Sequence, residues 1–225
     1  ADVNTADVLA VLTPIWTAKP ETARRVKQRI GTVLKWAVAQ GWRQDNPADV
    51  INEALPKHDR TKTHRKALPY QDVSGCLSAV QNSNAGIATK LALELLILTA
   101  TRSGEVRNAV WSEFDLSNAE WIIPVARMKA KKEHRIPLSN RAVALMKQAE
   151  ALGGDELVFE GMKRGKALSS ATLSKLVKEL GFNVDIHGFR TSFRTWTQEQ
   201  TNFPREVAEA ALAHSIKDKA EAAYA

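Results

Sequence analysis

The chain has 225 residues, 44% of them hydrophobic and 25% charged, which is enough for one large domain or two small ones. These values exclude a disordered tail, a collagen-like repeat and a disulfide-framed miniprotein. A single cysteine, Cys76, excludes an intrachain disulfide and a cysteine-based zinc cluster, and it fits a cytoplasmic compartment. The net charge of +7 and the pI near 9.6 favour a polyanionic partner.

Residues 1–56 are predicted to form a helical domain. Asn4 can cap a first helix, Pro20 can start a longer one, and Gly41 can stop it. Residues 45–47 (Asp-Asn-Pro) can cap a short third helix. The long helix should bury one apolar stripe, formed by Val26, Ile30, Val33, Leu34, Ala37 and Val38.

Basic charge is concentrated in the first part of the chain. Residues 1–66 hold 12 Lys and Arg against 7 Asp and Glu, and the polar segment 57–66 reads as an interdomain linker. These residues can contact a phosphate backbone, although a solubilising face and a solvated loop are the alternatives. The candidate DNA contacts here are Arg24, Arg25, Lys27, Lys57, Arg60, Lys62 and Arg65.

Residues 67–225 are predicted to form a second domain that is helical around a small sheet. The apolar run 91–100 is about half of the ~20 residues that a membrane helix needs, so it predicts a buried helix and no membrane partner. The pattern over 110–123 predicts a hairpin, and 135–138 a further strand. The predicted helices are 70–81, 87–100, 139–152, 169–180, 188–199, 204–212 and 218–224. The predicted fold class is therefore mainly α with a small antiparallel sheet: a helical N-terminal domain followed by an α+β domain.

Three places in this second domain could bind an anion or move a proton. Arg102 stands where a new helix is predicted to begin, with Glu105 one turn on, although a surface ion pair is the commoner explanation. Residues 127–139 hold five Lys and Arg between extended runs, so Lys129, Lys131 and Lys132 lie on a basic hairpin tip or on a solvated turn. His187 and Arg190 are three residues apart at a predicted helix start.

The last candidates lie near the end of the chain. His214 follows a short helix, and Tyr224 lies ten residues beyond it. Tyr70 and Tyr224 are the chain's two tyrosines, so tyrosine chemistry has two candidates. Each cluster alone is weak evidence, and their order is the specific signal.

That order resembles the tyrosine recombinase (phage integrase) family over residues 68–225. The matching segments are Thr99 to Glu105, Met128-Lys129 with His134-x-x-Pro137-Leu138-Ser139, His187 to Arg190, Leu212 to His214, and Ala223-Tyr224. Residues 1–66 resemble the core-binding domain of prophage integrases of the P4 type. The implied organisation is a core-binding domain at 1–56, a linker at 57–66 and a catalytic domain at 67–225.

The resemblance implies site-specific cleavage and rejoining of DNA through a 3′-phosphotyrosyl intermediate, for integration or excision of a mobile element, without metal, ATP or another cofactor. The implied roles are Tyr224 as nucleophile, His187 as its base, Arg102 and Arg190 as the phosphate clamp, Lys129 as proton donor to the leaving 5′-oxygen, His214 as a phosphate hydrogen-bond donor, and Glu105 as support for Arg102. A type IB topoisomerase would use the same chemistry. A non-enzymatic DNA-binding regulator would explain the charge, but not six catalytic-type residues in order.

The implied partners are double-stranded attachment sites, a homotetramer on DNA for a full-length member, and DNA-bending accessory proteins, in the cytoplasm at the nucleoid. The chain begins without Met and stops one residue after Tyr224. We therefore expect a monomeric fragment with a shortened N-terminus, lacking the C-terminal helix that commonly docks on a neighbouring protomer.

Overall fold

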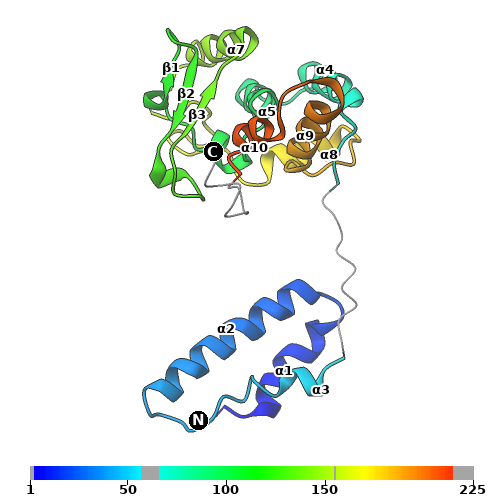
Figure 1. Cartoon of the computed structure of the whole chain (residues 1–225), viewed down its shortest axis with the longest axis vertical. Coiled ribbons are helices and arrows are strands. Elements are labelled where there is room, and N and C mark those ends of the chain that lie inside the picture. Colours follow the sequence, from blue (N-terminus) through cyan, green and yellow to red (C-terminus); the bar gives the residue numbers. More distant parts are fainter. Residues whose placement is uncertain (1–2, 57–65, 155, 215–225) are drawn as a thin grey trace. The chain divides into compact units, whose positions relative to one another are not determined.

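The computed structural model describes residues 3–56, 66–154 and 156–214. The chain divides into two compact units, Ala1–Thr63 and His64–Ala225 (Figure 1). The predicted linker at 57–66 lies outside the described residues except for Lys66. Among the described helices, none is both long and apolar enough to cross a membrane.

The N-terminal unit contains α1 (Thr5–Trp16), α2 (Pro20–Ala39) and α3 (Ile51–Ala54). Asn4 caps α1 as predicted, because its side chain accepts the backbone N–H of Asp7 and the Asp7 carboxylate accepts that of Asn4. Pro20 is the first residue of α2, where its missing N–H costs nothing. The small core of this unit comprises Val8, Leu12, Trp16, Ala23, Leu34, Ala48, Ile51 and Leu55.

Two predictions for this unit are wrong in detail. Val33 is 64% exposed, because one short neighbouring helix covers only a narrow stripe of α2 and Val33 lies about a hundred degrees around the helix from Leu34. The third helix begins at Ile51 rather than directly after 45–47. Asn46 instead closes a turn, in which its side chain accepts the N–H of Ala48.

The second unit confirms the mainly α fold class with its small sheet. Within its described residues, three short 3-10 segments accompany the helices: η1 (Tyr70–Asp72), η2 (Trp111–Glu113) and η3 (Val125–Arg127). The sheet has the order β1 (Phe114–Asp115), β2 (Glu120–Ile123) and β3 (His134–Pro137), all antiparallel. The helices are α4 (Val73–Asn82), α5 (Ile87–Thr99), α6 (Ser103–Arg107), α7 (Asn140–Glu150), α8 (Thr172–Glu179), α9 (Gly188–Gln200) and α10 (Arg205–Ala211).

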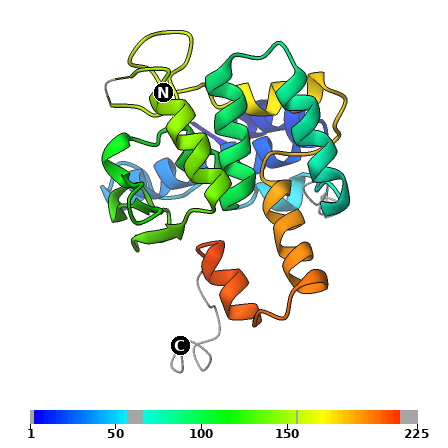
Figure 2. The ribbon, with the colours of Figure 1, turned by 90° about the horizontal axis from the view of Figure 1, so that it is seen from above.

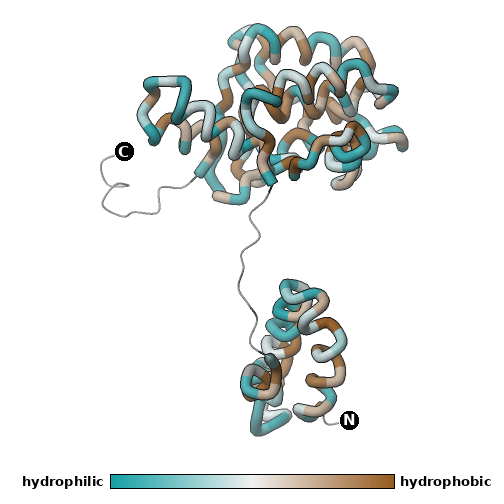
Figure 3. The backbone as a smooth tube through the Cα atoms, turned by 90° about the vertical axis from the view of Figure 1, so that its right-hand side faces the viewer, coloured by the Kyte–Doolittle hydropathy of each residue, from teal (hydrophilic) through white to brown (hydrophobic). Residues whose placement is uncertain are grey.

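Helix α5 is the centre of this unit. It is buried along most of its length and packs against α4, α6, α7, α8 and α9, as its nearly continuous apolar sequence predicts. The other helices alternate apolar and polar positions because each has one buried face (Figure 3). Helices α9 and α10 project from one side of the unit and are joined by a short loop (Figure 2).

The sheet buries one face by the alternation expected for strands. Trp121 and Ile123 on β2 are buried together with Ile136 and His134 on β3, and Trp121 stacks on Phe114 at a ring-centroid distance of 5.0 Å. Arg135, on the opposite face, is exposed and pairs with Glu120. His134 is therefore the polar member of an otherwise apolar face.

The start of the second unit crosses the start of α9. The backbone N–H of Asp185 donates to the carbonyl of Lys66, and the Asp185 carboxylate accepts the N–H of Lys66. A Cβ at Gly188 would stand 2.1 Å from the Lys66 carbonyl oxygen. Only glycine permits this approach, which fixes the helix that carries Arg190.

The sole cysteine offers a direct test of this packing. Cys76 is fully buried in α4, and burial raises the pKa of its thiol to about 11. We expect the folded chain to react with a disulfide reagent at least about 100-fold more slowly than the urea-unfolded chain. Equal rates before and after unfolding would contradict this packing of α4.

Candidate active site

Arg102 is held by Glu105 at the start of α6. One Glu105 carboxylate oxygen accepts the Arg102 backbone N–H at 2.7 Å, and the other accepts Nη1 of the guanidinium at 2.7 Å. Glu105 is 6% exposed, whereas the Arg102 side chain is 25% exposed. The two side chains are paired, and the burial of Glu105 distinguishes this pair from a surface ion pair.

Arg190, in the first turn of α9, is 4% exposed. Its guanidinium donates to the carbonyls of Ala100 and Leu212, and Nη2 lies 3.1 Å from Nε2 of His214. Burial, and secondly the charge of Arg102, lower the pKa of Arg190 to about 10, so it remains a cation at neutral pH. Its Nε is buried and has no acceptor among the described residues.

Two left-handed backbone turns aim carbonyls at these cations. Ala100 ends α5 with φ 48°, and Ala213 follows α10 with φ 47°. The Ala213 carbonyl accepts Nη2 of Arg102 at 3.3 Å, beside the Leu212 carbonyl that serves Arg190. Alanine adopts this conformation at a cost of about 1 kcal/mol, and such strain gathers at functional sites. The two turns thus bring both guanidiniums to the same short segment of chain.

His214 joins this cluster through both ring nitrogens. Because a guanidinium can only donate, Nε2 accepts from Arg190, and Nδ1–H then donates to Glu209 at 2.6 Å. Glu209 also pairs with Arg194 at 3.0 Å. Burial acts to raise the pKa of Glu209, but the hydrogen bond from His214 and the charge of Arg194 outweigh it and lower this pKa.

The other predicted catalytic residues are His187, Lys129 and Tyr224. His187 occupies the N-cap position of α9 without a side-chain capping bond, and it is exposed, one turn before Arg190. Lys129 is exposed on the turn between η3 and β3. Tyr224 lies outside the described residues.

The candidate DNA contacts fall into three groups. Arg24 and Lys27 line a hollow of about 390 Å³ on α2 together with Lys35, which pairs with Asp49 at 3.6 Å. Arg24 and Arg25 both pair with Glu21, and Arg25 is not part of the hollow. Lys131 and Lys132 are exposed on the same turn as Lys129. Lys57, Arg60, Lys62 and Arg65 lie outside the described residues.

Three further residues face the arginine cluster, and the sequence alone assigned none of them a role. Glu209 holds His214, Arg127 donates to the backbone carbonyl of Glu105, and the buried ring of His134 hydrogen-bonds the backbone of Ala211. Burial lowers the pKa of His134, and the charges of Arg102 and Arg190 lower it further, against opposing effects of Glu105 and of the Ala211 carbonyl. Arg127 and His134 belong to the basic segment 127–139 singled out in the sequence, whereas nothing in the sequence marked Glu209, five residues before His214.

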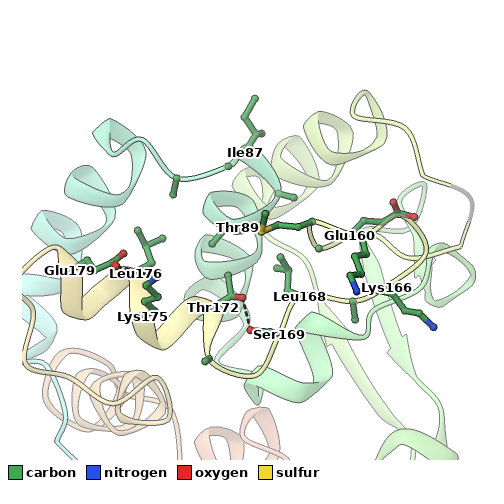
Figure 4. Close-up of a pocket in the computed structure, with 18 residues that line it drawn as sticks. Ile87, Thr89, Glu160, Lys166, Leu168, Ser169, Thr172, Lys175, Leu176 and Glu179 are labelled. Atoms are coloured by element: carbon green, nitrogen blue, oxygen red, sulfur yellow. Dashed lines mark hydrogen bonds and ion pairs between the residues drawn. The ribbon is translucent and has the colours of Figure 1, made fainter.

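A larger hollow, of about 770 Å³, lies between the start of α5, the segment 160–169 and α8 (Figure 4). Lys166, Lys175, Glu160 and Glu179 stand around it, and the Ser169 and Thr172 hydroxyls bond each other at 2.9 Å. Its mixed charges form no convergent set, unlike the arginine cluster. Across the described part of the chain, no group of three His, Cys, Asp or Glu residues is placed to hold a metal ion.

Replacing Glu105 with Gln tests whether it holds Arg102. The amide lacks the charge and one of the two acceptors, so we expect unfolding of the second unit to become about 2 kcal/mol easier. The measurement is urea unfolding followed by reaction of Cys76. The control is Glu179→Gln, whose 3.6 Å pair with Lys175 is exposed and should change stability by less than about 0.5 kcal/mol. An effect no larger than the control's would contradict this role.

Comparison with known proteins shows which family this chain resembles. Residues 66–225 match the Phage integrase family and residues 1–54 the Phage integrase central domain. The chain is 32% identical to the prophage integrase IntZ of Escherichia coli K12, over 96% of this chain and 54% of that protein. It is also 32% identical to the integrase of enterobacteria phage P4, over 92% of this chain and 51% of that protein. The chain therefore spans about half the length of these relatives.

Solved structures share the fold. A lambda integrase (75–356) dimer bound to a COC′ core site superposes with a TM-score of 0.70 at 20% identity, over 96% of this chain and 80% of that one. A lambda integrase tetramer bound to a Holliday junction gives 0.69 at 19% identity, over 97% of this chain and 66% of that one. The family match covers well over half of the chain and includes the arginine cluster, so the chain belongs to the phage integrase family.

Proposed function

We propose that this chain is the core-binding and catalytic part of a site-specific tyrosine recombinase, which cleaves and rejoins DNA for integration or excision of a mobile element. The observation that carries the proposal is the convergence of Arg102, Arg190 and His214 on one short stretch of backbone at 212–214. Two fixed guanidiniums side by side suit a phosphodiester, whose two non-bridging oxygens each accept hydrogen bonds.

The chemistry follows from what a phosphodiester exchange requires. The Tyr224 oxygen attacks the scissile phosphorus and the bond to the 5′-oxygen breaks, which leaves a 3′-phosphotyrosyl link and a free 5′-hydroxyl. A phenol has a pKa of about 10, so it must lose its proton as it attacks, and His187 is the proposed base. Arg102 and Arg190 stabilise the charge that develops on the non-bridging oxygens.

The leaving 5′-oxygen needs a proton, and Lys129 is the proposed donor. His214 donates to the phosphate in this scheme once its Nε2 carries a proton. The phosphotyrosyl link conserves the energy of the broken bond, so rejoining needs no ATP. Because the two guanidiniums supply the charge that a metal supplies in other phosphoryl-transfer sites, we propose a metal-independent reaction.

Binding is proposed to use both units. Arg24, Lys27 and Lys35 offer a basic surface on α2, and Lys131 and Lys132 offer another beside Lys129. The similar lambda integrase structures are a dimer on a core site and a tetramer on a Holliday junction. By that likeness we propose double-stranded attachment sites and assembly on DNA as partners, together with accessory bending proteins, in the bacterial cytoplasm at the nucleoid.

Tyr224→Phe tests the nucleophile. The probe is a labelled pool of nicked duplexes randomised at their centre, because a nick lets the cleaved end diffuse away and traps the adduct. We expect the unmodified chain to form an adduct that survives a denaturing gel, and Tyr224→Phe to form none while its DNA affinity stays within about two-fold, since only the attacking oxygen is removed.

Tyr70→Phe is the matched control. The Tyr70 hydroxyl accepts from Gln200 at 2.9 Å, and burial together with Glu199 raises its pKa, which disfavours a phenolate. This variant should keep the adduct. An adduct that persists in Tyr224→Phe would contradict the proposed nucleophile. Two-site recombination by the unmodified chain would separate a recombinase from a topoisomerase, which only relaxes supercoils.

Salt dependence tests the proposed binding of phosphates by α2. The logarithm of the DNA association constant should fall steeply as the logarithm of the salt concentration rises. The double variant Arg24→Ala, Lys27→Ala should make that slope shallower by about 0.9 for each phosphate that it no longer neutralises. The measurement is fluorescence anisotropy on a duplex recovered from the captured pool. Lys147→Ala with Lys178→Ala, on exposed faces of α7 and α8, removes the same charge and should leave the slope nearly unchanged. A flat response of the unmodified chain would contradict binding through phosphates.

A further inference from the structure

The turn Met128–Glu133, called here the lysine turn, carries the proposed proton donor Lys129. Residues 129–133 are exposed, and Lys131 has φ 51°. A proton donor must stand within hydrogen-bond reach of the oxygen that it serves. An exposed lysine has many rotamers, so its reach depends on how firmly both ends of the turn are held.

Arg127 holds the first end of the turn. Its Nη1 donates to the Glu113 carboxylate, which is 4% exposed and also accepts Nε1–H of Trp121 at 3.0 Å. Its Nη2 donates to the backbone carbonyl of Glu105, the residue that holds Arg102. Arg127 therefore ties the segment two residues before Lys129 to the helix of the first catalytic arginine.

His134 holds the second end. It is the first residue of β3, pairs with Ile123 in the sheet and is 9% exposed. Its ring hydrogen-bonds the backbone of Ala211, at the end of α10 and three residues before His214. The lowered pKa keeps the ring neutral at pH 7, so it adds no third positive charge beside Arg102 and Arg190.

Ordinary packing explains only part of this arrangement. An ion pair between Arg127 and Glu113 would satisfy the buried carboxylate by itself, and a buried strand position accepts an apolar side chain. The remaining bonds leave the sheet and reach the two segments that carry Arg102 and His214. The bond from Arg127 to Glu105 precedes the six-residue turn and the bond from His134 to Ala211 follows it. Together they fix the position of the turn relative to the arginine cluster.

We propose that Arg127 and His134 are positioning residues for Lys129, which anchor the two ends of the lysine turn to the elements that carry the phosphate-binding groups. The inference rests on the proposed function, because it assumes that Lys129 protonates the leaving 5′-oxygen. It assigns roles to two residues that touch no reacting atom.

Replacing the bridging 5′-oxygen by sulfur at the mapped cleavage position isolates this role. When Tyr224 attacks, the P–O bond breaks and Lys129 gives its proton to the 5′-oxygen. A thiol has a pKa of about 8.5 and leaves as the thiolate without a proton donor. A defect confined to positioning of Lys129 therefore slows cleavage of the oxygen substrate and not that of the sulfur substrate.

The variants are Arg127→Lys, which cannot donate to both acceptors, and His134→Phe, which keeps a buried ring without a donor. We expect single-turnover cleavage of the oxygen substrate to fall at least about ten-fold, since general acid catalysis contributes about 10²-fold or more, and that of the sulfur substrate to stay within about three-fold. His134→Gln restores a donor and should recover part of the rate. Arg135→Lys, the same substitution on the exposed face of β3, keeps the charge. Because its pairs with Glu120 and with Glu133 of the turn are exposed, it should leave both rates within about two-fold.

A double-mutant comparison adds a second readout. In a Lys129→Ala background, Arg127→Lys and His134→Phe should cause no further decrease on the oxygen substrate, because the residue through which they act is gone. Additive decreases, or equal decreases on the oxygen and sulfur substrates, would overturn the inference and make both residues purely structural.

Limited trypsin digestion tests the anchors without any DNA. Cleavage after Lys129, Lys131 and Lys132, mapped by mass spectrometry, should be about five-fold faster in Arg127→Lys and His134→Phe than in the unmodified chain or Arg135→Lys. Unchanged cleavage would overturn the inference whatever the enzymatic result. An unmodified chain that forms no DNA adduct, but whose turn is protected as expected, would refute the proposed function and leave the two anchors supported.

Discussion

The structure depends on holding two like-charged guanidiniums close together in a largely buried place. Arg190 is 4% exposed and Arg102 partly so, and each disfavours the charge of the other. The buried carboxylate of Glu105 and the carbonyls of three residues compensate them. Without these acceptors, desolvation of two cations would cost several kcal/mol, so the site exists only where the fold brings the acceptors together.

Backbone geometry does much of this compensation. The left-handed turns at Ala100 and Ala213 end two helices and direct carbonyls at the arginines, as helix ends otherwise direct them at water or capping groups. These acceptors belong to the end of α5, to α6 and to the turn after α10. A bound oxyanion would meet donors already oriented for it, which is the electrostatic preorganisation that phosphoryl transfer needs.

The lysine turn extends the same principle to the proposed proton donor. A flexible, exposed side chain is useful in catalysis only if its base is placed, and the bonds of Arg127 and His134 place it against α6 and the end of α10. The proposed site is thus assembled from strand, helix and turn elements, and Arg127 and His134 bond the backbone of Glu105 and Ala211 beside the arginine cluster. The sheet is therefore joined to the proposed site by the hydrogen bonds of Arg127 and His134 as well as by apolar packing.

The sequence alone determined the mainly helical fold class, the sheet and the order of Arg102, Lys129, Arg190 and His214, because side-chain periodicity and motif spacing are local properties of the chain. It also placed Glu105 beside Arg102, one helical turn away. Only the tertiary structure decided that Val33 is exposed, that Arg190 is buried against carbonyls, and that Arg127 and His134 reach α6 and Ala211. Every residue has a backbone carbonyl, so residue identity cannot show which carbonyls will accept hydrogen bonds from the arginines. Contacts between segments that are far apart in the sequence arise only when the chain has folded.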